Sequence, residues 1–203
     1  MVGRNQRKDA LRRGRRLEYL TLSWNGVESV VSVGAGLAAG SPSLVGFGID
    51  ALIEGVSGAT LLWRLQDEAD HQRREAFALK LVGISFLLLA AWVAFESAEA
   101  LVLSTAPDVT RLGIAIAALS LLVMPWLAYK KRQVAGVLES RALEADSRQT
   151  DLCAYLSAIL LVGLLLNAAF GLWWADPAAG LAMVPIIGRE GLSALRGERC
   201  ACE

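Results

Sequence analysis

The chain has 203 residues, of which 55% are hydrophobic and only 20% are charged. A water-soluble domain of this size could not easily cover so much apolar surface with polar side chains, so the composition excludes an ordinary soluble protein. Twenty basic and twenty acidic residues cancel to a formal net charge of zero, which gives no sign of nucleic-acid binding. We therefore expect an integral membrane protein whose partners include the lipid bilayer and no nucleic acid.

Six apolar stretches follow one another along the chain, at 17–40, 43–65, 77–95, 112–129, 152–174 and 177–195. Most of them approach the roughly 20 residues that a helix needs to cross the hydrocarbon core. The last is the weakest, because Pro185, Arg189 and Glu190 shorten its apolar part, and with five spans the C-terminus would lie outside. We predict an all-α membrane protein with six transmembrane helices over 17–195, a basic segment at 1–16 and a short tail at 196–203. A signal peptide is not expected, because a full-length span follows the basic start.

The basic residues predict the orientation of the chain in the membrane. Lys and Arg accumulate on the cytoplasmic side of short loops. All but one of the twenty lie on one predicted side, whereas the connections 40–43, 96–111 and 174–177 contain only Arg111. This pattern predicts cytoplasmic N- and C-termini in a multi-pass protein of the cytoplasmic membrane.

The second apolar stretch contains two acids, Asp50 and Glu54. An ionisable side chain at membrane depth is costly, so it is expected to face a partner, an ion or a water-filled cavity. A spacing of four places both carboxylates on one helical face, where they repel each other when ionised. A bound divalent cation would relieve that repulsion. The alternative is a protonated pair hydrogen-bonded to neighbouring helices; we favour a metal site because a structural role seldom needs two acids on one buried face.

A second polar pattern opens the fifth stretch. Spacings of three and four place Asp146, Gln149 and Cys153 along one helical face, whereas Asp151 points elsewhere. Carboxylates together with a thiolate suit zinc, cadmium or cobalt better than calcium or magnesium. The alternative, a solvated first helical turn followed by an ordinary buried thiol, stays open.

Other acids and thiols are additional candidates, among them Asp151 of the fifth stretch. Glu28 is a buried acid in the first stretch that could complete the site or carry a proton. Cys200 and Cys202 form a Cys-x-Cys pair in the tail, which could capture a soft metal or could simply be two exposed thiols. Three cysteines in such a chain do not make a disulfide framework, and they indicate a reducing compartment.

The sequence around these acids resembles the cation diffusion facilitator family of metal transporters. Residues 40–50 read Gly-Ser-Pro-Ser-Leu-Val-Gly-Phe-Gly-Ile-Asp and, with Glu54 after them, are similar to the family's second helix. The resemblance implies a six-helix bundle of the cation efflux type. It also implies that Asp50 and Glu54 occupy two ligand positions.

The fifth helix of the family is also recognisable, in altered form. Ala145 and Asp146 match the Ala-Asp that precedes the family's histidine, so Gln149 and Cys153 stand where the family has a His-x-x-x-Asp pair. The resemblance extends towards the sixth helix through segments 155–157, 163–164 and 174–177, with one extra residue needed between Cys153 and Asp176. The family exchanges zinc or a related ion for protons, which implies a transported metal and no separate cofactor.

Two departures from the family pattern concern coupling and assembly. Gln149 cannot take up a proton as an imidazole does, so any proton exchange would rely on Asp50, Glu54, Asp146 or Cys153. The family's C-terminal cytoplasmic metal-binding domain, which commonly supports dimerisation, has no counterpart in these 203 residues. A homodimer is therefore left open.

The depths of the two candidate helices impose a further condition. Cys153 lies twenty residues from Trp173, about 30 Å of helix, whereas Glu54 lies only about 18 Å from Pro42. A site shared by these helices requires a tilt, or a fifth helix that projects beyond the bilayer.

The sequence supports one leading function and one alternative. The leading hypothesis is a transporter that exports a divalent metal cation from the cytoplasm, Zn²⁺ or a related ion such as Co²⁺ or Cd²⁺, with protons as counter-ion. The ion would bind between the second and fifth helices. The alternative is a non-transporting metal-binding regulator or partner subunit of the same fold. An enzyme is not expected, since no nucleophile–base pairing or phosphate-binding glycine loop is present in the sequence.

Overall fold

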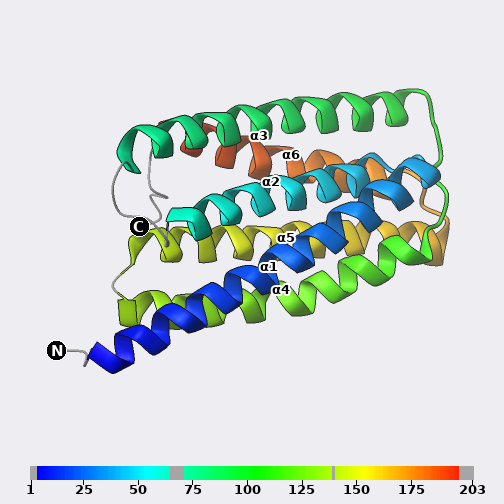
Figure 1. Cartoon of the computed structure of the whole chain (residues 1–203). Coiled ribbons are helices and arrows are strands. Elements are labelled where there is room, and N and C mark those ends of the chain that lie inside the picture. The colour runs from blue at the N-terminus through cyan, green and yellow to red at the C-terminus, as the bar shows by residue number, and fades with distance from the viewer. Residues whose placement is uncertain (1–3, 65–70, 139, 197–203) are drawn as a thin grey trace.

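A computed structural model of the chain describes residues 4–64, 71–138 and 140–196. Six long helices run side by side in alternating directions through these residues, so α1 begins and α6 ends at the same end of the bundle (Figure 1). The helices are α1 (Arg4–Ala39), α2 (Pro42–Arg64), α3 (His71–Val102), α4 (Arg111–Leu138), α5 (Arg141–Phe170) and α6 (Ala175–Arg196). The all-helical fold expected from the sequence is confirmed.

Local chemistry sets several of the helix boundaries. Gly40, at φ 63°, ends α1 in the left-handed conformation that glycine adopts without steric cost, and Pro42 then opens α2 at a position that needs no backbone N–H. Ser140 caps α5 by accepting a hydrogen bond from the Leu143 backbone N–H, and Gly171, at φ 65°, closes the helix. These caps fix where α2 and α5 start, and those two helices hold most of the candidate site.

Three helices are long and apolar enough to cross a membrane, as judged over the residues that the structure describes: Gly83–Val102, Arg111–Leu138 and Asp146–Phe170. Of the other three helices, α1 starts with many basic residues, α2 contains two acids among small residues, and α6 carries Arg189 and Glu190. Crossing of the membrane by all six helices therefore stays a prediction.

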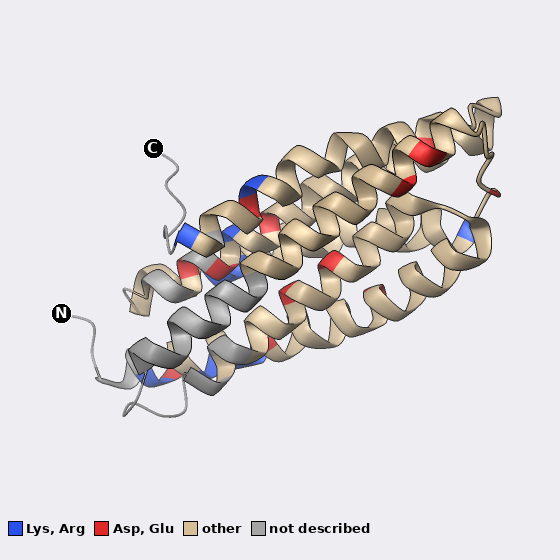
Figure 2. Ribbon diagram, turned by 90° about the horizontal axis from the view of Figure 1, so that it is seen from above, with Lys and Arg blue, Asp and Glu red and all other residues tan. Residues whose placement is uncertain are grey.

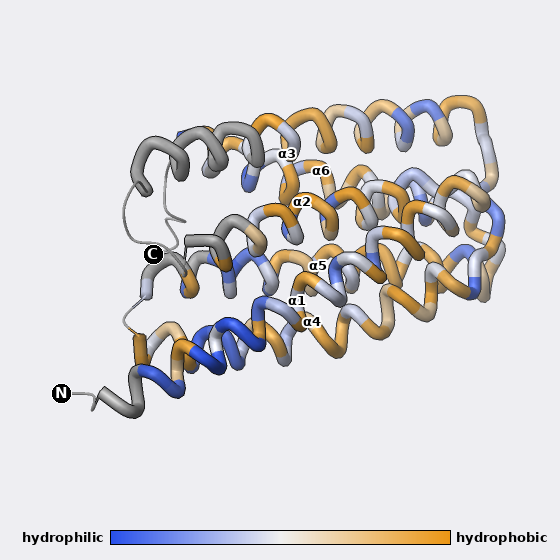
Figure 3. The backbone as a smooth tube through the Cα atoms, in the orientation of Figure 1, coloured by the Kyte–Doolittle hydropathy of each residue, from blue (hydrophilic) through white to orange (hydrophobic). Residues whose placement is uncertain are grey.

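Hydrophobic residues predominate along the middle of the bundle (Figure 3). Large hydrophobic side chains on all six helices point outwards and are exposed, which suits contact with lipid and would be unfavourable in water. They include Val30, Leu37, Leu52, Leu88, Phe95, Leu122, Tyr155, Val162 and Leu192.

Lys and Arg gather at the end of the bundle where α1 begins and α6 ends (Figure 2). Arg111 is at the opposite end, because it is the first residue of α4. The helix directions thus bring the basic segments together as the loop pattern predicted. Assignment of this end to the cytoplasm stays a prediction, since it rests on the charge pattern alone.

The helices pack around one main hydrophobic core. Its fully buried members include Leu44, Phe47, Met124, Leu160 and Met183, which come from α2, α4, α5 and α6. The most extensive helix pairs are α1 with α2, α4 with α5 and α3 with α6. This pairing leaves α2 and α5 in contact with each other inside the bundle.

Asp176, at the start of α6, ties that helix to the connection between α1 and α2. Its Oδ1 accepts hydrogen bonds from the hydroxyls of Ser41, at 2.8 Å, and Ser43. All three side chains are buried. A carboxylate that accepts two hydroxyl donors in a buried position fixes the relative position of α2 and α6 at this end.

Replacement of Asp176 by Ala should therefore destabilise the bundle, because it leaves two buried hydroxyls without their acceptor. We expect Asp176→Ala to lower the free energy of unfolding by about 2 kcal/mol, measured by thermal or denaturant unfolding in detergent. Asp108→Ala is a matched control, since Asp108 lies near the same end and is exposed. Equal stability of the two variants would contradict this role of Asp176.

Candidate functional site

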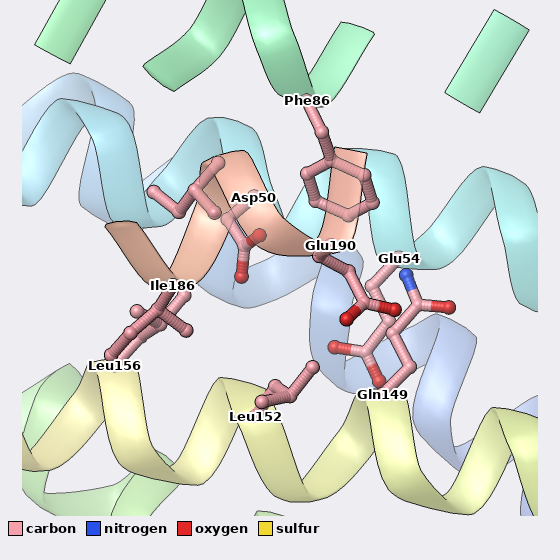
Figure 4. Close-up of a pocket in the computed structure, with 9 residues that line it drawn as sticks. Asp50, Glu54, Phe86, Gln149, Leu152, Leu156, Ile186 and Glu190 are labelled. Carbon is pink, nitrogen blue, oxygen red and sulfur yellow. The ribbon is translucent and has the colours of Figure 1, made fainter. Parts of the chain in front are cut away.

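The two acids of α2 lie inside the bundle, as the sequence predicted. Asp50 and Glu54 are 6% and 2% exposed, and both line a pocket between α2, α5 and α6 (Figure 4). The pocket has room for about one water-sized sphere. Its other walls are formed by Phe86, Gln149, Leu152, Leu156, Ile186, Ile187 and Glu190. Three carboxylates, those of Asp50, Glu54 and Glu190, thus line a narrow space whose other walls are mostly apolar.

Glu54 is connected directly to α5. The Thr150 hydroxyl donates a hydrogen bond to Glu54 Oε1 at 2.9 Å, and both side chains are buried. This bond places the acids of α2 level with the start of the polar face of α5. Glu54 and the start of α5 are therefore side by side, while the tilt or projection of α5 in the membrane stays a prediction.

Two polar atoms of the pocket residues have no hydrogen-bond partner. They are Oε2 of Glu54 and Nε2 of Gln149, and both are buried from solvent. A buried polar atom without a partner costs about 1–3 kcal/mol, so an oxygen left in this state has capacity for a ligand. The side chains of Glu54, Gln149 and Glu190 point towards the same space in Figure 4.

Cys153 and Glu28 meet on another side of Glu54, between α5 and α1. The Cys153 thiol donates to Glu28 Oε1 at 3.9 Å, and the two residues are 1% and 0% exposed. Glu28 Oε2 and both side-chain polar atoms of the neighbouring Asn25 are buried without a partner. The thiol and the additional acid proposed from the sequence are therefore in contact.

The two acids of α5 that the sequence singled out, Asp146 and Asp151, have cationic partners. Asp146 is buried, and its Oδ2 lies 2.5 Å from the ammonium of Lys131 on α4. Asp151 forms an ion pair with Arg132 near the surface. Asp146, Gln149 and Cys153 follow one side of α5, but the structure gives each of them a different set of neighbours.

Sequence reasoning missed three residues of this region. Glu190 on α6 was interpreted only as an interruption of the last span, yet it lines the pocket. Thr150 connects α5 to Glu54 through a hydrogen bond. Nothing in the sequence, where it stands between Gln149 and Asp151, indicated this contact. Lys131 was assigned to a cytoplasmic loop, whereas it is fully buried in α4, because this helix continues to Leu138.

The described residues provide buried candidate ligands but not a complete metal site. Among the side chains that the structure describes, no three His, Cys, Asp or Glu residues converge closely enough to hold a metal ion. The candidate ligands are spread in a row across α1, α2 and α5. Their side chains would have to move closer together to bind a cation. Cys200 and Cys202, the tail candidates, lie outside the described residues.

The sequence was compared with known families and proteins. Residues 19–197 match the family described as the cation efflux transmembrane domain. Transmembrane protein 163 of Xenopus laevis is 28% identical over 158 residues, which cover 76% of this chain and 56% of that protein. The uncharacterized transporter MJ0449 of Methanocaldococcus jannaschii is 25% identical over 179 residues, 84% of this chain and 63% of that protein.

These matches cover most of this chain, but less than two thirds of either relative. The matched segment begins at residue 19 in α1, ends just beyond α6, and so includes every residue of the buried site. The six described helices, their apolar outer surface and the acids of α2 agree with that match. The chain belongs to the cation efflux transmembrane domain family.

Proposed function

We propose that this protein transports a divalent metal cation, which binds between α2 and α5. The observation that carries the proposal is the buried pair Asp50 and Glu54, one helical turn apart beside a small pocket, with one Glu54 oxygen unpartnered. Two desolvated carboxylates on one face favour a doubly charged partner, because the cation offsets both their charges and their mutual repulsion.

Membership of the cation efflux family supports transport over other roles for such a site. One relative carries the name of a transporter, although uncharacterized, and this agrees with the same class of function. We propose efflux from the cytoplasm as the direction, with Zn²⁺ as the first candidate and Co²⁺ or Cd²⁺ as related ones. Protons are the proposed counter-ion, and the cytoplasmic membrane the proposed location.

The proposed ligands are Asp50, Glu54, Gln149 and Cys153. Carboxylate oxygens, an amide oxygen and a thiolate form a mixed set, which suits borderline metals better than calcium or magnesium. The sequence also placed Asp146 in the ligand set, with Asp151 and Glu28 as additional candidates, but Asp146 is paired with the ammonium of Lys131. Of these, Glu28 is the one in contact with a proposed ligand, because the Cys153 thiol donates to it.

A non-transporting regulator that binds metal is the second candidate. It is favoured by one observation, the side chain of Gln149, which lies in the pocket where the family pattern has a histidine. An amide binds metal weakly and cannot exchange a proton, so a site with Gln149 could retain an ion without a proton-driven release step.

Uptake of Zn²⁺, Co²⁺, Cd²⁺ and Mn²⁺ into proteoliposomes, with and without a pH gradient, distinguishes the two candidates. Transport predicts flux of at least one of these ions, and proton coupling predicts that the gradient changes its rate. Metal binding at equilibrium without any flux would favour the regulator.

Removal of either acid on α2 should abolish the proposed transport. We expect Asp50→Asn and Glu54→Gln, which keep size and polarity but lose the charge, to reduce metal flux by about 100-fold or more. Asp151→Asn is the matched control, because Asp151 lies on the adjacent helix near the surface, paired with Arg132. Normal flux in both α2 variants would contradict the proposed site.

Replacement of Cys153 tests the choice of ion rather than transport itself. A hydroxyl is a poorer ligand than a thiolate for soft metals, so Cys153→Ser should lower uptake of Cd²⁺ relative to Mn²⁺ by about tenfold. Competition uptake with both ions in one assay measures this ratio. An unchanged ratio would remove Cys153 from the ligand set, while leaving Asp50 and Glu54 untouched.

A further inference from the structure

Lys131 occupies an unusual position for a cation in a membrane domain. It is the only Lys or Arg among the residues with described burial that is fully buried, and it lies on α4, outside the lining of the pocket. Burial of an unpaired ammonium is very costly, so the groups around it are expected to be anionic or strongly polar.

Three oxygens surround this ammonium. Lys131 Nζ lies 2.5 Å from Asp146 Oδ2, 3.3 Å from Glu18 Oε2 and 3.4 Å from Thr150 Oγ1. Glu18 is itself fully buried, on α1, and its second carboxylate oxygen has no partner. One ammonium thus joins α1, α4 and α5 at the level of the metal candidates. We call these four residues the lysine cluster.

The lysine cluster is connected to Glu54 through a single hydroxyl. Thr150 receives a hydrogen bond from Lys131 and donates to Glu54 Oε1 at 2.9 Å. A threonine has one hydroxyl proton, and the backbone carbonyl of Asp146, at 3.2 Å, is its other acceptor within reach. Thr150 can therefore leave Glu54 for that carbonyl without losing a hydrogen bond, which frees Glu54 Oε1 for a cation.

We propose that Lys131 is an internal counter-cation that opposes metal binding at Asp50 and Glu54 and limits how tightly the ion is held. The carboxylates of Glu18 and Asp146 attract the Lys131 ammonium and keep it from moving closer to Glu54. The proposal rests on the proposed function, because it concerns the affinity of that site. It assigns to Lys131 a positioning role through charge, without direct contact with the ion.

The physical basis is the long range of charge interactions in a medium of low dielectric constant. A divalent ion at Glu54 would lie two hydrogen bonds away from the ammonium, with one hydroxyl between them. Repulsion over such a distance is only weakly screened inside a bundle without bulk water. A transporter must release its ion as well as bind it, so a fixed repulsive charge next to the site favours release.

Zinc titration of the purified full chain in detergent micelles tests this proposal with three variants. Lys131→Met removes the repulsive charge and should tighten Zn²⁺ binding by about tenfold or more. Glu18→Gln/Asp146→Asn keeps Lys131 but removes its two acids, so the ammonium acts unopposed on Glu54 and binding should weaken by about tenfold or more.

The triple variant Glu18→Gln/Lys131→Met/Asp146→Asn separates charge from ligation. If Lys131 acts through its charge, adding Lys131→Met to the double variant should restore affinity. If the double variant instead binds weakly because Asp146 is a direct ligand of the ion, adding Lys131→Met should not restore affinity. Lys130→Met is the matched control, because Lys130 lies next in the chain, over the ring of Tyr129 and away from the lysine cluster. Its affinity for Zn²⁺ should equal that of the wild type.

Failure of the proposed function and failure of this inference give different results. A wild-type chain that binds none of Zn²⁺, Co²⁺ and Mn²⁺ contradicts the proposed function together with this inference. A wild type that binds Zn²⁺, with affinity unchanged in Lys131→Met and no recovery in the triple variant, overturns the inference alone. In that case shifts in thermal unfolding would show that the lysine cluster is only structural.

Discussion

Carboxylates buried in an apolar helix bundle must be matched by positive charge or by hydrogen-bond donors, and this constraint organises the interior of the protein. Four acids on three helices face one another across the bundle, at Glu18, Glu28, Glu54 and Asp146, with Asp50 one turn along α2 from Glu54. These acids meet the constraint with three kinds of partner. Asp146 and Glu18 have an ammonium, Glu28 has a thiol, and Glu54 has a hydroxyl on one of its two oxygens.

The polar interior draws on apolar and polar helices alike. Buried or pocket-lining acids come from α1, α2 and α6. The apolar spans of α4 and α5 also contribute, through Lys131 and Asp146. Glu190, which shortens the apolar part of the last predicted span, is also a residue that lines the pocket.

Much of the fold and part of the site could be predicted from sequence. Apolar runs located six helices, and the spacing of Asp50 and Glu54 placed them on one face because helix geometry is local. Helix ends were less predictable: α1 extends back to Arg4 and α5 to Arg141, since backbone hydrogen bonds continue past the point where apolar residues stop. Gly171 ended α5 although apolar residues follow it.

Contacts between distant segments could not be predicted in the same way. Lys131 stands in the run Lys130, Lys131, Arg132, which has the composition of a solvated loop, and only the packing of α1 and α5 against α4 distinguishes it from its neighbours. The partnership of Glu28 with Cys153 joins residues 125 positions apart. Spacing along one helix carries no information on such a pair.

The proposed transport and the proposed role of Lys131 both require a divalent cation to bind between α2 and α5, at the buried acids. Ultraviolet and visible absorption of Co²⁺ bound to the purified protein tests this binding most directly, because the bands of this ion report both its occupancy and its ligands. We expect a saturable Co²⁺ spectrum that is lost in the double variant Asp50→Asn/Glu54→Gln and loses its near-ultraviolet thiolate charge-transfer band in Cys153→Ser. An identical spectrum in wild type and in the Asp50→Asn/Glu54→Gln variant would contradict it.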